Sequence, residues 1–121
     1  MAVTEARFGR VAVLCGGPGV EREVSLESGE AIARSLREAG VDARKIVIAG
    51  EPAEIARLEC DRVFVAIHGE FGEDGTLQRL LEARGLAYTG SPAAACALAM
   101  DKDASKKRLR EAGLPTADWV V

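Results

Sequence analysis

Residues 11–26 read VAVLCGGPGVEREVSL, an apolar run that ends in two glycines and continues into a polar loop. The apolar run, residues 10–15, has the length and composition of a strand that is buried on both faces of a sheet. Beyond the loop, apolar residues recur at helical spacing, and we expect a helix with Ser25 as its N-cap and Gly40 as its end. The stretch therefore predicts a strand, a loop and a helix in succession.

Residues 63–78, VFVAIHGEFGEDGTLQ, repeat this arrangement, with a strand that ends at a polar loop beginning with His68. Strands that alternate with helices are typical of right-handed crossovers and of a parallel sheet with helices on both faces. We therefore expect an α/β fold, a three-layer parallel sheet of about four strands. The further strands are expected at residues 43–49, 63–67 and 86–89, and the further helices at residues 52–58, 77–84, 92–100 and 101–112.

The composition is that of an ordinary globular chain of one domain. The 121 residues are 48% hydrophobic and 29% charged, with a net charge of −3, so no basic surface for nucleic acid is expected. The three cysteines, Cys15, Cys60 and Cys96, are odd in number and widely spaced, which argues against a disulfide framework or zinc knuckle and favours a reducing cytoplasm.

Membrane association and secretion are not expected. The sequence has no run of about 18 apolar residues, and the N-terminus lacks the apolar segment of a signal peptide. At the other end, residues 118–121 look like a strand that has just begun, so we expect the chain to be part of a longer protein.

In a parallel sheet, the loops after the first and third strands emerge at the same carboxyl edge, where open α/β sheets bind ligands. The Gly16-Gly17 turn and the helix that follows would favour an anion, although glycines also end many strands for steric reasons. The segment matches neither the dinucleotide-binding pattern nor the phosphate loop with its lysine. One shared site is expected at this edge, with its ligand left open.

Several side chains near this edge have a functional and a structural interpretation. Glu21 and Glu23 could hold a substrate ammonium, or could be solvated charges at a helix N-terminus. His68, the sole histidine, could face a ligand or make a structural hydrogen bond. Lys102 belongs to a solvated helix face unless a ligand phosphate reaches it.

A second group of carboxylates lies in the loop after residue 67. Glu70, Glu73 and Asp74 do not follow the calcium-loop pattern, and only one imidazole is near them in the sequence. Asp74 is better explained as a cap of the next helix, so no metal site is expected.

Four motifs occur together, in residues 16–29, 68–78, 88–91 and 100–102. In this combination the chain resembles the D-alanine–D-alanine ligases of the ATP-grasp family, over essentially its whole length. The resemblance implies a Rossmann-like, pre-ATP-grasp domain in residues 1–100 that positions substrate. Residues 101–121 would then be the first helix and the opening strand of an incomplete ATP-grasp central domain.

The resemblance also implies an activity. These ligases join two D-alanines for peptidoglycan synthesis, converting ATP to ADP and phosphate through an acyl phosphate. Glu21 would hold the ammonium of the first D-alanine, Val24 would contact its methyl group, His68 would lie near its reacting carboxyl group, and Lys102 would reach the ATP phosphates. One departure is Gly19, where many relatives carry serine.

The resemblance implies D-alanine, ATP and Mg²⁺ (or Mn²⁺) as ligands of a cytoplasmic, homodimeric parent protein. The metal-binding carboxylates of the family would lie beyond Val121, so residues 1–121 alone are expected to bind ATP and metal poorly and to be inactive. Two alternatives stay open: a related D-alanyl–D-lactate ligase, and a nucleotide- or anion-binding module without catalysis.

Overall fold

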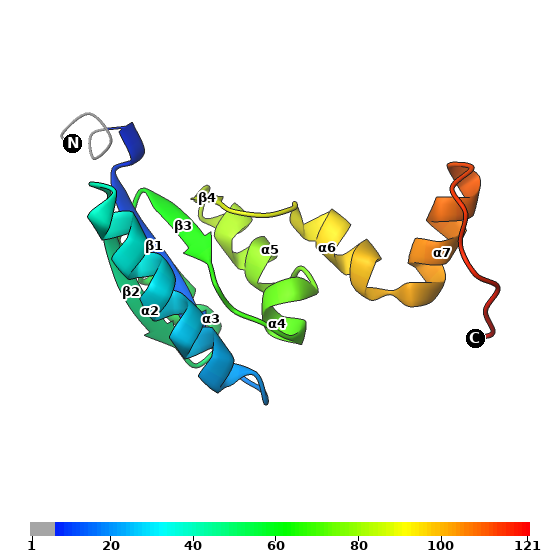
Figure 1. The fold of residues 1–121 in the computed structure, drawn as a ribbon, viewed down its shortest axis with the longest axis horizontal. Coiled ribbons are helices and arrows are strands. Elements are labelled where there is room, and N and C mark those ends of the chain that lie inside the picture. Colours follow the sequence, from blue (N-terminus) through cyan, green and yellow to red (C-terminus); the bar gives the residue numbers. More distant parts are fainter. Residues whose placement is uncertain (1–6) are drawn as a thin grey trace.

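The computed structural model of the chain describes residues 7–121, and a four-stranded parallel sheet forms its centre (Figure 1). The expected α/β fold is confirmed, and no strand end lies more than two residues from its expected position. The strands, in the spatial order β2-β1-β3-β4, are β1 (Arg10–Gly16), β2 (Asp42–Ile48), β3 (Arg62–Val65) and β4 (Ala87–Tyr88).

Helices cover both faces of the sheet because the side chains of the central strand β1 alternate between them. Val13 and Cys15 pack with α2 (Arg22–Glu38) on one face. Leu14 packs on the opposite face, with α3 (Pro52–Ala56) and α5 (Thr76–Ala83). The result is the expected three-layer arrangement.

Gly29 of α2 lies very close to the sheet. A Cβ atom on this residue would lie 2.5 Å from the Cβ of Cys15, a separation that real side chains do not reach. The glycine therefore allows α2 to lie directly on β1, and burial there raises the pKa of the Cys15 thiol.

The expected N-cap of α2 is wrong. The helix begins at Arg22, so Ser25 lies within its first turns and is fully buried. Its hydroxyl bonds to backbone groups of β1 and of the chain after β3 instead of to the helix N-terminus. A tertiary contact therefore replaces the local capping bond that the sequence pattern suggests.

A short helix that the sequence did not predict, α4 (Glu70–Glu73), follows the loop after β3. After β4 the chain leaves the sheet and forms an arm of two helices, α6 (Ala93–Met100) and α7 (Lys102–Glu111), which projects away from the domain (Figure 1). Asp101 caps α7, because its carboxylate accepts a hydrogen bond of 3.0 Å from the Ala104 N–H.

The start of the arm is tied to α5 by one carboxylate. Oε1 of Glu82 accepts hydrogen bonds from the Tyr88 hydroxyl at 2.6 Å and from the Ala93 N–H at 2.9 Å. The backbone bond from Ala93, followed by the Tyr88 bond, lowers the pKa of Glu82. Burial and the bond to Glu82 raise the pKa of Tyr88 to about 12.

The opening strand expected after Pro115 is not formed. Residues 114–121 run beside α7 without regular structure, and side chains of α7 form hydrogen bonds with them. Lys106 Nζ donates to the Ala117 carbonyl at 2.9 Å, and Trp119 Nε1 donates to Asp103 at 2.7 Å. A strand needs a neighbouring strand, and nothing in residues 7–121 pairs with this segment.

None of the helices in residues 7–121 is long and apolar enough to cross a membrane. The expectation that the N-terminus holds no signal peptide concerns mainly residues 1–6, which lie outside the described range.

Candidate functional site

An open cleft of about 590 Å³ lies at the carboxyl edge of the sheet. One wall is the loop after β1, from Pro18 to Glu21, and the other is the segment 68–71 after β3, with Asp74 and Thr76 beyond it. The structure therefore brings Glu21 and His68 into one cleft, although 46 residues separate them in the sequence.

The β1 loop is held in place at both ends. Gly16 and Gly17 adopt left-handed φ angles of +91° and +74°, which let the chain turn sharply at the end of the strand. Arg22 Nη1 then donates to the carbonyls of Gly17 at 3.0 Å and Ile48 at 2.9 Å. This guanidinium fixes the loop that carries Glu21 against the end of β2.

Sequence reasoning missed this role of Arg22. An arginine between two glutamates looks like a solvated charge, and the only local signal was its place in the first turn after a double-glycine loop.

The backbone amides of the turn are not available to an anion. The Gly16 N–H donates to Ser25 Oγ at 2.9 Å, and the Gly17 N–H donates to the Ile48 carbonyl at 2.8 Å. The glycines are therefore explained by the sharp turn and its internal bonds. The two glycine amides are therefore not donors for an anion.

The loop after β3 is tied to α2 by two serines. Ser25 Oγ donates to the Ala66 carbonyl at 2.6 Å, in addition to its bond with Gly16, so a single hydroxyl connects the ends of β1 and β3. Ser28 Oγ lies 3.3 Å from Nε2 of His68, which is half-buried. Sequence reasoning also missed Ser28, because its partner is 40 residues away.

The cleft is rich in carboxylates. Glu21, Glu70 and Asp74 all line it, together with the imidazole of His68. The Glu21 side chain lies against the β3 loop, since a Cβ placed on Gly69 would be 3.2 Å from Glu21 Oε2. Such a site suits a small ligand with an ammonium group better than a free anion.

Asp74 is not the N-cap of α5, which is Gly75, but it lies directly before that residue and bonds to the start of the helix. Its Oδ1 accepts a hydrogen bond of 2.8 Å from the Thr76 N–H, at the start of α5. Within the described part of the chain, no three His, Cys, Asp or Glu side chains gather in a way that could hold a metal ion. The residues present therefore do not fit Mg²⁺ or Mn²⁺.

Two of the four candidate residues lie elsewhere. Val24 is 57% exposed in the first turn of α2, and Lys102 is the first residue of α7 on the arm. Neither lines the cleft that Glu21 and His68 share in residues 7–121. The structure thus joins the two loop residues and leaves Lys102 on a separate part of the chain.

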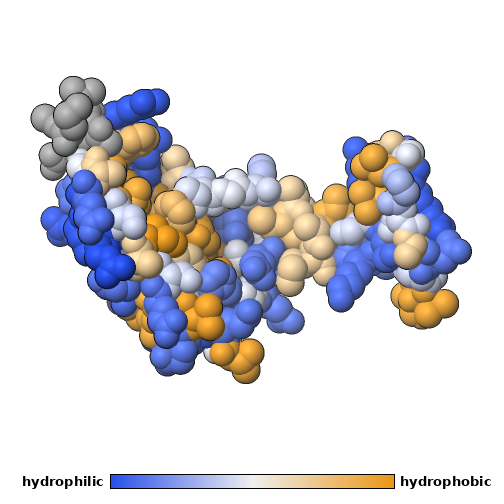
Figure 2. Space-filling view, viewed as in Figure 1, coloured by the Kyte–Doolittle hydropathy of each residue, from blue (hydrophilic) through white to orange (hydrophobic). Residues whose placement is uncertain are grey.

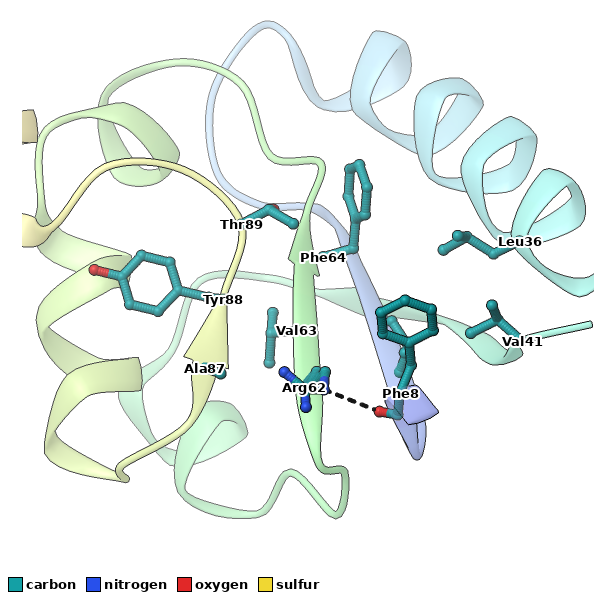
Figure 3. Close-up of a pocket in the computed structure, with 10 residues that line it drawn as sticks. Phe8, Leu36, Val41, Arg62, Val63, Phe64, Ala87, Tyr88 and Thr89 are labelled. Carbon is teal, nitrogen blue, oxygen red and sulfur yellow. Dashed lines mark hydrogen bonds between the residues drawn. The ribbon is translucent and has the colours of Figure 1, made fainter. Parts of the chain in front are cut away.

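A second hollow, of about 290 Å³, opens between α2 and the strands β3 and β4, where Figure 2 shows apolar side chains at the surface. Figure 3 shows Phe8, Leu36, Val41 and Phe64 around this space. The only charged side chain in its lining is Arg62, whose Nε donates to the Phe8 carbonyl at 3.2 Å. With no carboxylate in that lining, the hollow offers no charged partner for an ammonium group.

Known proteins match this chain over most of its length. Residues 50–91 match the family model described as the D-ala D-ala ligase N-terminus. A D-alanine–D-alanine ligase of Ralstonia pickettii (strain 12J) is 49% identical over 119 residues, which cover 94% of this chain and 35% of that protein. One of Aquifex aeolicus (strain VF5) is 44% identical over 111 residues, or 91% of this chain and 38% of that protein.

Solved structures agree with the sequence matches. The crystal structure of a D-alanine–D-alanine ligase from Bacillus anthracis superposes with a TM-score of 0.84 and 34% identity, covering 92% of this chain and 37% of that one. A second structure of the Bacillus anthracis ligase, complexed with ATP, gives the same TM-score. The resemblance to the N-terminal part of these ligases is confirmed, and the chain spans little more than a third of the relatives it matches.

Proposed function

We propose that this chain, which matches the N-terminal part of the D-alanine–D-alanine ligases in sequence and in fold, positions the first D-alanine in an ATP-dependent ligase. The observation that carries the proposal is the meeting of Glu21 and His68, from two separate loops, in one carboxylate-rich cleft. The product of the whole protein would be D-alanyl-D-alanine for peptidoglycan.

In this proposal the cleft binds the zwitterion of D-alanine. The Glu21 carboxylate accepts charge-assisted hydrogen bonds from the ammonium group, and His68 lies beside the carboxyl group that reacts. Val24 lies outside the cleft lining, so the contact with the methyl group that the resemblance implies would require the ligand to extend to the first turn of α2. Joining two small molecules depends on holding them in reacting order, and two anchor points on rigid loops fix the orientation of the first one.

The remaining parts of the reaction belong to the longer protein. ATP would phosphorylate the first D-alanine to an acyl phosphate, and the amino group of the second D-alanine would then displace phosphate. Lys102, on the arm, would contact the ATP phosphates. Because residues 7–121 do not form a site for Mg²⁺, that ion would be held by carboxylates outside this chain.

This proposal divides the chain into a substrate-positioning domain over residues 1–100 and the beginning of an ATP-grasp domain over residues 101–121. The structure has α7 on the arm, well away from the sheet, which is compatible with such a division (Figure 1). The longer protein would act in the cytoplasm as a homodimer.

The test is D-alanine-dependent release of ADP by this chain and by the same chain continued to the length of its relatives. We expect activity only in the longer protein. Glu21 is exposed in this open cleft. In the longer protein, where the ion pair with the ammonium would be enclosed, Glu21→Gln should lower kcat/KM for D-alanine about 100-fold, since removing one partner of an enclosed ion pair costs about 2–5 kcal/mol. The matched control is Glu23→Gln, two residues away and outside the cleft lining, with an expected change below about two-fold.

Equal losses in the Glu21 and Glu23 variants would contradict the ammonium-binding role. A folded longer protein that is inactive with two D-alanines, and active with D-alanine and D-lactate, would assign the chain to the related lactate ligases. Tight binding of nucleotide by residues 1–121 alone would instead favour a binding module without catalysis.

A further inference from the structure

We propose that Ser28 is a positioning residue for His68: its hydroxyl donates to Nε2 and so keeps the proton of the neutral ring on Nδ1. His68 would then present a hydrogen-bond donor to the carboxyl group of a bound amino acid. This inference rests on the proposed function, because it names what one side chain of that site does.

The geometry of α2 places the serine where this bond can form. Ser25 and Ser28 are three residues apart and lie on the same face of the helix. Gly29 lets that face lie directly on β1, and Ser25 holds the Ala66 carbonyl, two residues before His68. The backbone that carries His68 and the helix that carries Ser28 are therefore fixed relative to each other.

The bond uses one nitrogen of the ring. Ser28 Oγ lies 3.3 Å from Nε2, and within residues 7–121 the ring makes no other hydrogen bond. His68 lines the cleft, and also a hollow beside residues 89–91, and Nδ1 is the nitrogen that Ser28 leaves free for a ligand.

The chemistry of the ligand decides the direction of the bond. A carboxylate only accepts hydrogen bonds, so the ring nitrogen that meets it must carry a proton. In a neutral imidazole the other nitrogen is then an acceptor, and it needs a donor. The Ser28 hydroxyl can rotate to donate, and this satisfies both nitrogens without charging the ring.

The tautomer can be measured directly because His68 is the only histidine in the chain. Two-bond ¹H–¹⁵N correlation spectra of the ¹⁵N-labelled chain, at alkaline pH where an ordinary imidazole is neutral, give the ratio of Nδ1–H to Nε2–H forms. We expect the Nδ1–H form to dominate. Ser28→Ala should shift the ratio about five-fold towards Nε2–H, the factor that one hydrogen bond of ordinary net strength produces.

Two further variants isolate the hydroxyl. Ser28→Thr keeps the donor and should retain the wild-type ratio, whereas Ser35→Ala, at an exposed residue of the same helix, should leave it unchanged. A wild-type ring in which Nε2–H dominates would overturn the inference, as would a ratio unaffected by Ser28→Ala.

Ligase assays separate this inference from the proposed function. In the longer protein, Ser28→Ala should lower kcat/KM for D-alanine about five-fold, and Ser28→Thr should restore it. An unchanged kcat/KM in the alanine variant would overturn the positioning role. Absence of D-alanine-dependent activity in the wild-type protein would refute the proposed function, and the tautomer ratio would still decide whether Ser28 sets the state of the ring.

Discussion

The Ser25 hydroxyl shows how much can depend on a single atom. It is fully buried, and it joins the Gly16 N–H to the Ala66 carbonyl. Replacing it with alanine would leave a buried donor and a buried acceptor without partners, each of which costs about 1–3 kcal/mol.

We therefore expect Ser25→Ala to lower the free energy of unfolding by about 2–4 kcal/mol, measured by urea denaturation. Ser35→Ala, at an exposed position of α2, is the matched control and should change the stability by less than about 0.5 kcal/mol. Similar effects of the two substitutions would show that the Ser25 bonds add nothing to stability.

The residue scale is also where sequence reasoning was weakest. Glu21 and His68 could be singled out because each follows an apolar strand run, and parallel strands place such residues at one edge. Ser28 and Arg22 could not, because each bonds to a group far away in the sequence, His68 in the β3 loop and Ile48 at the end of β2, and no local pattern records a bond that forms only on folding. Ser25 was assigned a local capping role for the same reason.

At the scale of elements, the junction between α5, β4 and α6 depends on the charge of Glu82. Hydrogen bonds from Ala93 and Tyr88 lower the pKa of this carboxyl in the folded chain. The stabilising effect of the ionised Glu82 is therefore fully present above about pH 4.5, the pKa of this carboxyl in the unfolded chain. It is lost as the pH falls through the lower pKa that the carboxyl has in the folded chain.

The free energy of unfolding, measured by urea titration at a series of pH values, should fall less steeply below about pH 4.5 in Glu82→Gln than in the wild type. Glu59→Gln, at another exposed glutamate, serves as the control and should leave the wild-type pH profile intact. Two superimposable profiles for Glu82→Gln and the wild type would mean that the junction does not depend on the ionised carboxylate.

The element boundaries explain what the sequence pattern can and cannot predict. Strands β1 and β3 were found because each is a short run of mainly apolar residues between turn signals, whereas β2 is apolar mainly in its second half and β4 has only two residues. The helix α4 was missed because its four residues, with a glycine among them, are too few to show periodicity. The strand expected at residues 118–121 did not form, because a strand needs a neighbour to pair with and the local sequence does not show whether one is present.

On the scale of the whole molecule, the arm makes the chain longer than a compact domain. A compact domain of 121 residues has a radius of gyration of about 14 Å. Because α6 and α7 project away from the sheet, we expect small-angle X-ray scattering of the monomer to give a clearly larger value (Figure 1). A dilution series controls for self-association, and a value near 14 Å would show that the arm folds back on the domain in solution.

The strand order has a consequence for synthesis on the ribosome. β1 is made first but lies in the middle of the sheet, and its second neighbour, β3, is complete only at Val65. The leucines that cover its second face, Leu77 and Leu81, emerge later still. Synthesis runs at about 5–20 residues per second, so the nascent chain spends several seconds with one edge and one face of the apolar strand β1 still exposed. A pause in translation before β3 would prolong this exposure and with it the risk of aggregation.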